Sequence, residues 1–195
     1  MCGRYTITTP GKKLAEYFKA ALPVHPITLN TNAKPTQNLP IITEEHPDQI
    51  VLAHWGYPIH IGAKEKELIN VRAESIETKP FFKRAAEHYR CIILADGFYE
   101  WKKEPHKKQP YELTVSYAPI AFAGIYALKE KTMSKESIPF FSIITVPANP
   151  FMKNIHDRMP VILEHGEEKL WLDNFDIKML RPFRHQMKAL AVSKL

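Results

Sequence analysis

Residues 91–102 have the sequence CIILADGFYEWK, and this stretch decides the class of fold. Cys91–Ala95 is an unbroken apolar run of strand length, typical of a strand buried on both faces. Asp96-Gly97 is a turn signal, and Phe98–Lys102 brings the aromatic residues that strands favour. The stretch therefore predicts two successive strands, the first of them inside the core.

Strand patterns recur on both sides of this stretch. The other expected strands are Tyr5–Thr8, Gln49–Trp55, Leu68–Arg72, Tyr111–Val115, Ile120–Leu128, Phe140–Val146 and a last one near Ala189–Val192. Helices are expected after Thr9-Pro10, from Thr78-Lys79-Pro80, over about Glu167–Leu172 and over Asp176–Arg184, with a long loop over Pro23–Pro47. Because strands and helices do not alternate regularly, the sequence predicts an α+β fold. We expect a single domain over residues 1–195, with a mainly antiparallel, barrel-like β-sheet core and several short helices.

Two of the expected helices are amphipathic. The first should extend for about three turns, with an apolar face of Leu14, Tyr17, Phe18, Ala21 and Leu22. The second has an apolar face of Phe82, Ala85, Ala86 and Tyr89, and a basic side of Lys83, Arg84, His88 and Arg90.

Composition narrows the class of function. The 195 residues include 27 Lys and Arg against 21 Asp and Glu, a formal net charge of +6, which favours an anionic partner such as nucleic acid. Two cysteines form no disulfide framework, and neither CxxC nor HExxH is present, so no metal and no cofactor is expected. Without a signal peptide or an apolar run of roughly 20 residues, the expected location is the cytoplasm, with no membrane association.

Cys2 is the first candidate for chemistry. Initiator methionine is usually removed before a small residue, which leaves Cys2 with an α-amine and a thiol on adjacent carbons. Such an amine has a pKa of about 7.7–8.0, so roughly a tenth of it is unprotonated at neutral pH. It can condense with an aldehyde, and the thiol can then close a five-membered thiazolidine on the same carbon. The alternative is a chance cysteine at a frayed terminus, although Gly3, Arg4 and a strand from Tyr5 would hold the chain there.

Three polar clusters supply further candidates. Asn70 and Arg72 share one face of an expected strand. Glu100 lies between aromatic residues, where desolvation would raise its pKa and make it a general acid, or it is an exposed strand residue. His156 and Arg158 fall within one turn and offer a titratable imidazole and a phosphate-binding guanidinium, or the histidine is structural.

Residue types alone leave two other classes of function open. Cys2 as nucleophile with His156 as base would give an amidohydrolase or peptidase. The basic charge alone would fit a non-catalytic single-stranded DNA-binding module. The lysines around Glu104-Pro105-His106 are interpreted as a solvated hairpin turn.

Together these clusters resemble the SRAP family, the abasic site processing proteins first named SOS-response-associated peptidases. The resemblance rests on Met1–Tyr5 (MCGRY), Asn32–Gln37 (NAKPTQ), His54–Gly56 (HWG), Asn70–Ser75 (NVRAES), Arg90–Trp101 (RCIILADGFYEW) and Ala148–Pro160 (ANPFMKNIHDRMP). One departure is Trp55-Gly56-Tyr57-Pro58-Ile59, which lacks the second tryptophan usual in the family.

The resemblance implies a function and roles for residues. Cys2, once Met1 is removed, would form a covalent thiazolidine crosslink with an abasic site in single-stranded DNA and so shield the lesion. Asn70 would orient the terminus, Glu100 would act as acid and base in ring opening and imine formation, and His156 would assist ring opening or reversal. From the resemblance and from the residue clusters described above, the residues expected to contact DNA are Gly3, Arg4, Trp55, Arg72, Arg84, Trp101, Thr145 and Arg158. Lyase activity, removal of its own first residue, a monomeric state and, in a bacterium, association with the nucleoid are also expected.

Overall fold

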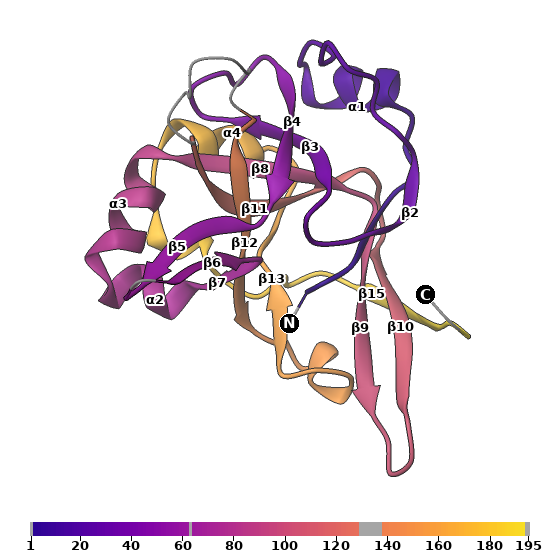
Figure 1. Ribbon diagram of the computed structural model, residues 1–195. Coiled ribbons are helices and arrows are strands. Elements are labelled where there is room, and N and C mark those ends of the chain that lie inside the picture. Colours follow the sequence, from indigo (N-terminus) through magenta and orange to yellow (C-terminus); the bar gives the residue numbers. More distant parts are fainter. Residues whose placement is uncertain (1, 63, 129–137, 194–195) are drawn as a thin grey trace.

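The computed structural model describes residues 2–62, 64–128 and 138–193 (Figure 1). The strands are β1 Tyr5–Ile7, β2 Asn30–Ala33, β3 Asn38–Thr43, β4 Ile50–Trp55, β5 Tyr57–Ile61, β6 Lys64–Leu68, β7 Asn70–Arg72, β8 Arg90–Ala95, β9 Gly97–Lys103, β10 Lys108–Val115, β11 Ile120–Ala127, β12 Phe140–Pro147, β13 Arg158–Pro160, β14 Ile162–Leu163 and β15 Met187–Ala191. The helices are α1 Gly11–Phe18, α2 Ala73–Thr78, α3 Pro80–His88 and α4 Glu167–Asp173, with 3₁₀ turns η1 Met152–Asn154 and η2 Ile177–Met179.

A closed ring of strands forms the centre of the molecule. Its order is β12-β4-β3-β8-β11, and β11 pairs with β12 to close it. All of these pairs are antiparallel except β12–β4, and β7 also pairs with β12 in parallel. Closure removes open sheet edges, which is the physical advantage of a barrel. The predicted α+β fold with a mainly antiparallel, barrel-like sheet is confirmed.

The interior of the ring explains why its strands are so apolar. Every residue of β8 is buried, as the unbroken run Cys91–Ala95 predicts. Gly124 on β11 has no room for a side chain, because a Cβ there would be 2.7 Å from the Ser142 carbonyl oxygen on β12. A larger residue at 124 would push these two strands apart.

A second sheet, in the order β15-β10-β9-β1-β2, carries the N-terminal strand. In β1–β9, Tyr5 is opposite Phe98 and Thr6 is opposite Gly97. The β9–β10 hairpin extends away from the ring at the bottom of Figure 1, the same end of the molecule at which β13 and the N-terminus lie. The two strands of residues 91–102 therefore belong to different sheets, joined at Asp96-Gly97.

The structure corrects the expected extent of three segments. Helix α1 stops at Phe18 after about two turns, because Lys19 adopts a left-handed conformation with φ 53° and its N–H closes the last turn. The segment Pro23–Pro47 is not one loop, since it contains β2 and β3. Asp176–Arg184 is not an α-helix and holds only the short turn η2.

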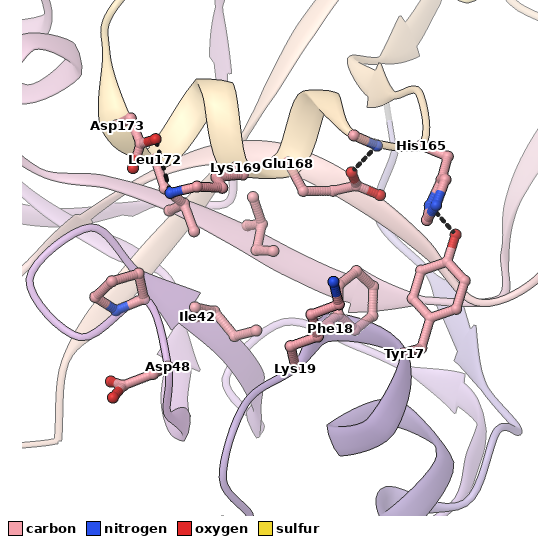
Figure 2. Close-up of a pocket in the computed structure, with 13 residues that line it drawn as sticks. Tyr17, Phe18, Lys19, Ile42, Asp48, His165, Glu168, Lys169, Leu172 and Asp173 are labelled. Atoms are coloured by element: carbon pink, nitrogen blue, oxygen red, sulfur yellow. Dashed lines mark hydrogen bonds and ion pairs between the residues drawn. The ribbon is translucent and has the colours of Figure 1, made fainter.

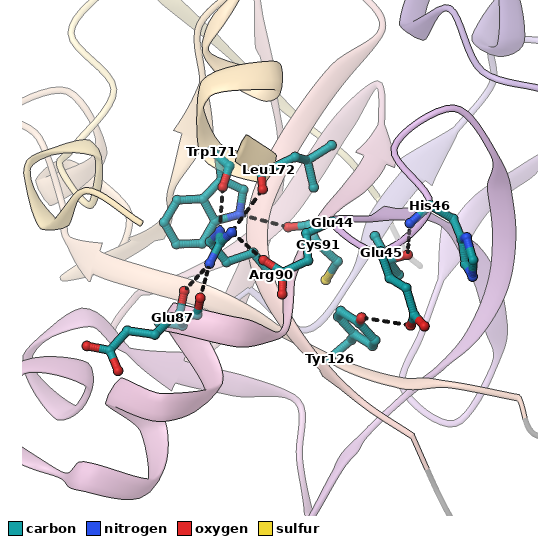
Figure 3. A network of polar contacts seen from close by, with 11 residues as sticks. Glu44, Glu45, His46, Glu87, Arg90, Cys91, Tyr126, Trp171 and Leu172 are labelled. Atoms are coloured by element: carbon teal, nitrogen blue, oxygen red, sulfur yellow. Dashed lines mark hydrogen bonds and ion pairs between the residues drawn. The ribbon is translucent and has the colours of Figure 1, made fainter. Parts of the chain in front are cut away.

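Arg90 was expected on the basic side of the helix, but it is the first residue of β8 and is buried (Figure 3). Its guanidinium donates to the main-chain oxygens of Ala86, Glu87, Trp171 and Leu172, and it forms an ion pair with Glu44. These carbonyls lie near the C-terminal ends of α3 and α4, where helices leave acceptors unpaired. Arg90 therefore joins both helices to the ring. Within the described ranges, no helix has the length and apolar character needed to cross a membrane.

Candidate functional site

The pairing of β1 with β9 brings the N-terminus beside Glu100. Tyr5 is opposite Phe98, and the Tyr99 N–H donates to the Arg4 carbonyl at 2.9 Å. The same antiparallel register, continued toward the terminus, sets Cys2 against the Glu100–Trp101 segment. Met1, whose removal the chemistry requires, lies outside the described residues.

Asn70 holds Cys2 from the other side. The Asn70 side-chain Nδ2 donates to the Cys2 carbonyl oxygen at 2.8 Å. Asn70 is fixed in turn by β7, where it lies opposite Ile143 of β12. Its Oδ1 is buried and accepts no hydrogen bond from any residue that the structure describes. A buried acceptor of this kind costs free energy, which a donor on the ligand or on a processed terminus would recover.

The Cys2 thiol is fully buried. Burial raises the pKa of the thiol well above its usual range, and the nearby charge of Glu100 raises it further. The thiol therefore stays protonated at neutral pH, and its attack on carbon must be coupled to loss of a proton.

Glu100 and His156 form the acid–base part of the cluster. The Glu100 side chain is 2 % exposed, and burial raises the pKa of its carboxyl, while positive charges nearby, His156 among them, oppose this shift. His156 Nε2 lies 3.8 Å from Glu100 Oε2. A carboxyl that holds its proton more tightly than usual is better suited to act as a general acid.

Neighbouring groups hold the His156 ring at its other nitrogen. The Arg158 main-chain N–H donates to Nδ1 at 3.0 Å, which makes Nδ1 an acceptor and leaves the proton of the neutral ring on Nε2, toward Glu100. Asp157 Oδ1 is 2.9 Å from the same Nδ1. The two contacts serve different protonation states, because a protonated ring donates from Nδ1 to the carboxylate.

Arg158 was expected to bind phosphate, but its guanidinium is engaged within the protein. It forms a two-point ion pair with Glu74, at 2.6 and 3.0 Å, and donates to the Thr145 carbonyl oxygen at 2.7 Å. Its side chain is only 10 % exposed, and hydrogen bonding to Arg158 lowers the pKa of Glu74. Arg158 therefore braces the loop that carries His156 in this structure.

Trp55 and Thr145, also expected near DNA, are buried. The Trp55 indole N–H donates to the Ile69 carbonyl oxygen at 2.9 Å, and its ring packs against Tyr5 and Phe141. Their side chains have no free surface to offer a DNA strand, because the ring core has enclosed them. Trp55 thus contacts β1 and β12, and the Thr145 hydroxyl donates to the Val71 carbonyl oxygen of β7 at 3.4 Å.

The remaining candidates are accessible. Arg72 is exposed, Gly3 and Arg4 are partly exposed, and Arg4 donates to Asn32 Oδ1 at 2.9 Å. Trp101 is half-buried on β9. Arg84 is exposed on α3, which Figure 1 shows at the far side of the ring from the β9–β10 hairpin, so the structure does not bring it to the Cys2 cluster.

A hollow of about 320 Å³ opens at the cluster and is lined by Glu100, Trp101, Lys103, Lys108 and His156. A larger hollow, of about 480 Å³, lies between α1 and α4 (Figure 2). Figure 2 shows hydrogen bonds between Tyr17 and His165 and between Lys169 and Asp173 at its wall. It contains none of the candidate residues, so chemistry is assigned to the smaller hollow.

Sequence reasoning missed the partners that orient these groups. Glu74, Asp157 and Asn32 each contact a candidate residue, although none was selected. Glu74 and Asp157 fall in the NVRAES and NIHDRMP stretches, but their partners become visible only once the chain is folded. Across the described ranges, no group of three or more His, Cys, Asp or Glu side chains is placed to hold a metal ion.

Comparison with known proteins agrees with this fold. A family model described as SOS response associated peptidase (SRAP) matches residues 1–195. The abasic site processing protein YoaM of Bacillus subtilis is 40% identical over an alignment of 183 residues that covers 89% of this chain and 79% of that protein. The abasic site processing protein YoqW of the same bacterium is 36% identical over an alignment of 212 positions that covers 100% of this chain and 93% of that protein. A crystal structure of a Bacteroides thetaiotaomicron protein superposes with a TM-score of 0.84 at 25% identity and covers 98% of this chain and 92% of that one. The chain therefore belongs to the SOS response associated peptidase (SRAP) family.

Proposed function

We propose that this protein processes abasic sites in single-stranded DNA by forming a covalent thiazolidine crosslink through Cys2 after Met1 is removed. The observation that carries the proposal is the position of Cys2, held by the 2.8 Å bond from Asn70 beside a buried Glu100. The printed names of the relatives, abasic site processing proteins, agree with this substrate. An abasic sugar opens to an aldehyde, which is the electrophile that a 1,2-aminothiol traps most durably.

The crosslink forms in two balanced steps. The Cys2 nitrogen attacks C1′ of the ring-opened sugar, the carbonyl oxygen is protonated, and loss of water gives an imine. Sγ then attacks the same carbon while the thiol proton passes to nitrogen, so one water is lost overall. The amine acts first because the buried thiol remains protonated. The second step is intramolecular, which favours it by an effective molarity that reaches roughly 10⁵ M or more.

Glu100 and His156 move the protons. Protonated Glu100 donates to the sugar oxygen as the ring opens and to the hydroxyl that leaves during imine formation. His156 exchanges that proton with Glu100 at Nε2 in the state in which its Nδ1 donates to the Asp157 carboxylate. The Asn70 Oδ1, which lacks a donor among the described residues, accepts from the Cys2 amine once it is free and aims its lone pair at carbon.

Arg4, Arg72 and Trp101 are the accessible groups that bind the strand. Arginine binds phosphate through two parallel hydrogen bonds, and an aromatic ring stacks on the base beside the lesion. Removing the base already leaves a gap in the strand, so Cys2 can reach C1′ without base flipping. This backbone affinity should fall as salt is raised.

Intact-mass spectrometry tests the proposal. A first spectrum should lack Met1, and a second, after incubation with an abasic oligonucleotide, should give the summed masses less one water. Cys2→Ala should give no stable adduct, whereas Cys91→Ala, which removes the other cysteine, should react like the wild type. A full-yield adduct with Cys2→Ala, or no adduct with the processed wild type, would refute the proposal.

The raised pKa of the Cys2 thiol disfavours the amidohydrolase or peptidase alternative, because that chemistry needs a thiolate. Amide turnover that is lost in Cys2→Ala and requires no DNA would support the peptidase instead. A non-catalytic binding module would bind DNA equally well with Cys2→Ser and gain no mass. Lyase activity would follow where the imine undergoes β-elimination before the thiol closes the ring. Action on DNA as a monomer, at the nucleoid in a bacterium, completes the proposal.

A further inference from the structure

The turn of the β9–β10 hairpin carries a dense cluster of lysines. Lys103 lies opposite Lys108 across the two strands, and Lys102 and Lys107 flank this pair. Lys103, Lys107 and Lys108 are exposed. We call these four residues the lysine hairpin. Sequence alone favours a solvated turn here. In the structure the hairpin extends away from the ring (Figure 1), and Lys103 and Lys108 line the hollow that Glu100 and His156 also line.

The charge of the lysine hairpin is poorly compensated within the protein. Lys107 Nζ is 3.7 Å from Glu104 Oε2. In the part of the chain that the structure describes, Lys103 and Lys108 form no ion pair. Side chains directly opposite each other on antiparallel strands have Cβ atoms about 4.5–5.5 Å apart, so two lysines there repel and destabilise the hairpin. An anion between them would remove this repulsion.

The position of the pair identifies the anion. Lys103 is three residues beyond Glu100 on the same strand, or about 10 Å at a rise of about 3.3 Å per residue. A DNA strand whose abasic sugar sits at Cys2 and Glu100 continues past this point and presents one phosphate per nucleotide. Trp101, between the two positions, offers an aromatic face to the intervening base.

We propose that Lys103 and Lys108 bind consecutive phosphates of the DNA strand on one side of the abasic site and so set the direction in which the strand lies across the hollow. This rests on the proposed function, because it takes the abasic sugar to be at Cys2. Lysine suits this role because a mobile point charge binds phosphates without reading sequence.

Salt dependence of binding tests the proposal. The ligand is a fluorescent single-stranded oligonucleotide with a central tetrahydrofuran site, which has no aldehyde and cannot crosslink. Each phosphate contact contributes about 0.7 to the slope of log K against log salt for single strands. The double variant Lys103→Gln/Lys108→Gln should therefore have a slope smaller by about 1.4. A fourfold increase in salt should cost the wild type about 7-fold more affinity than the variant.

Lys12→Gln/Lys13→Gln is the matched control, because it removes the same charge from the exposed face of α1 at the opposite end of the molecule. Its slope should equal that of the wild type. Removing nucleotides from one side of the lesion should weaken wild-type binding and leave the hairpin variant unaffected, whereas trimming the other side should weaken both. An unchanged slope for the hairpin variant, an equal change in the control, or equal trimming losses for both proteins on both sides would overturn the proposal.

The two proposals fail separately. With a true abasic site at saturating DNA, the hairpin variant should reach the same final yield of Cys2-dependent adduct as the wild type. Adduct formation with an unchanged salt slope would refute only the role of the lysine hairpin. A changed slope without any wild-type adduct would refute the crosslinking chemistry and leave the hairpin as a phosphate-binding element.

Discussion

Replacing Arg90 by methionine should destabilise this protein more than any substitution on its surface. The guanidinium is buried, donates to four main-chain oxygens and pairs with Glu44 (Figure 3). Methionine keeps the apolar part of the side chain and removes every one of these contacts. The acceptors at the ends of α3 and α4 would then be left without their donor, and Glu44 without its counter-ion.

The size of the effect follows from the burial of the Arg90 guanidinium and of the main-chain oxygens that it binds. Removing the guanidinium costs about 3–5 kcal/mol, because several desolvated main-chain acceptors lose their donor and Glu44 loses its counter-ion. For a chain of 150–250 residues, each kcal/mol lowers Tm by about 2–4 °C. Arg90→Met should therefore lower Tm by roughly 6–20 °C.

Thermal unfolding followed by circular dichroism measures this change. Arg84→Met makes the same substitution on α3 at an exposed site and should change the free energy of unfolding by no more than about 0.5 kcal/mol. Equal Tm values for the two variants would show that Arg90 does not join α3 and α4 to the ring, and the structural argument would be wrong.

Three further predictions concern the site. Asn70→Ala removes a hydrogen bond worth about 1 kcal/mol to the Cys2 carbonyl, so the adduct should form roughly 5-fold more slowly in a gel time course, with the same final yield. Burial raises the pKa of Glu100, so ionising this carboxyl in the folded state lowers the stability of the protein at pH values above the ordinary carboxyl pKa. Glu100→Gln should therefore have a higher Tm than the wild type at pH 8 and the same Tm in acid. The variant should also form adduct more slowly. Arg158 lowers the pKa of Glu74, so the ionised Glu74 carboxylate stabilises the fold at pH values above its ordinary pKa, and this stabilisation is lost as the pH falls through the lowered pKa. Glu74→Gln should therefore be less stable than the wild type in urea at pH 7 and equally stable in strong acid.

The local pattern of apolar residues predicts the ring strands well, because a continuous apolar run is stable only where both faces of the strand are buried. Cys91–Ala95 is such a run, and it is buried throughout. Pattern fails for β3, where Pro40 indicated a loop. The pairing of β3 with β8 begins at Ile41 opposite Ile93, one residue after the proline, so the missing N–H is tolerated there. Long-range pairing decided this strand, and no local window contains that information.

Candidate residues could be selected from the sequence, but their surroundings could not. Arg158 and Arg90 look like surface cations, yet each has partners brought to it by folding. Glu74, which binds Arg158, is 84 residues away in the chain. Trp55 looks like an exposed stacking residue, but it is enclosed because β4 is part of the closed ring. Residue type predicts what a side chain can bind, and topology decides what it does bind.

The cluster around Cys2 contains three features that lower the stability of the fold. A buried carboxyl with a raised pKa, a buried amide oxygen without a donor among the described residues, and two lysines directly opposite each other all cost free energy. The rest of the ring, by contrast, is apolar and closed. In the proposed complex, two of these costs are reduced by parts of one ligand: the sugar oxygen accepts a hydrogen bond from the protonated Glu100 carboxyl, and the phosphates lie beside the two lysines. The cost at the Asn70 Oδ1 would be reduced by the Cys2 amine of the processed protein, which then attacks the sugar. Binding of the tetrahydrofuran oligonucleotide should therefore raise the Tm of the wild type more than that of Lys103→Gln/Lys108→Gln at equal DNA concentration. Equal increases in Tm would show that the repulsion between the two lysines is not relieved by DNA.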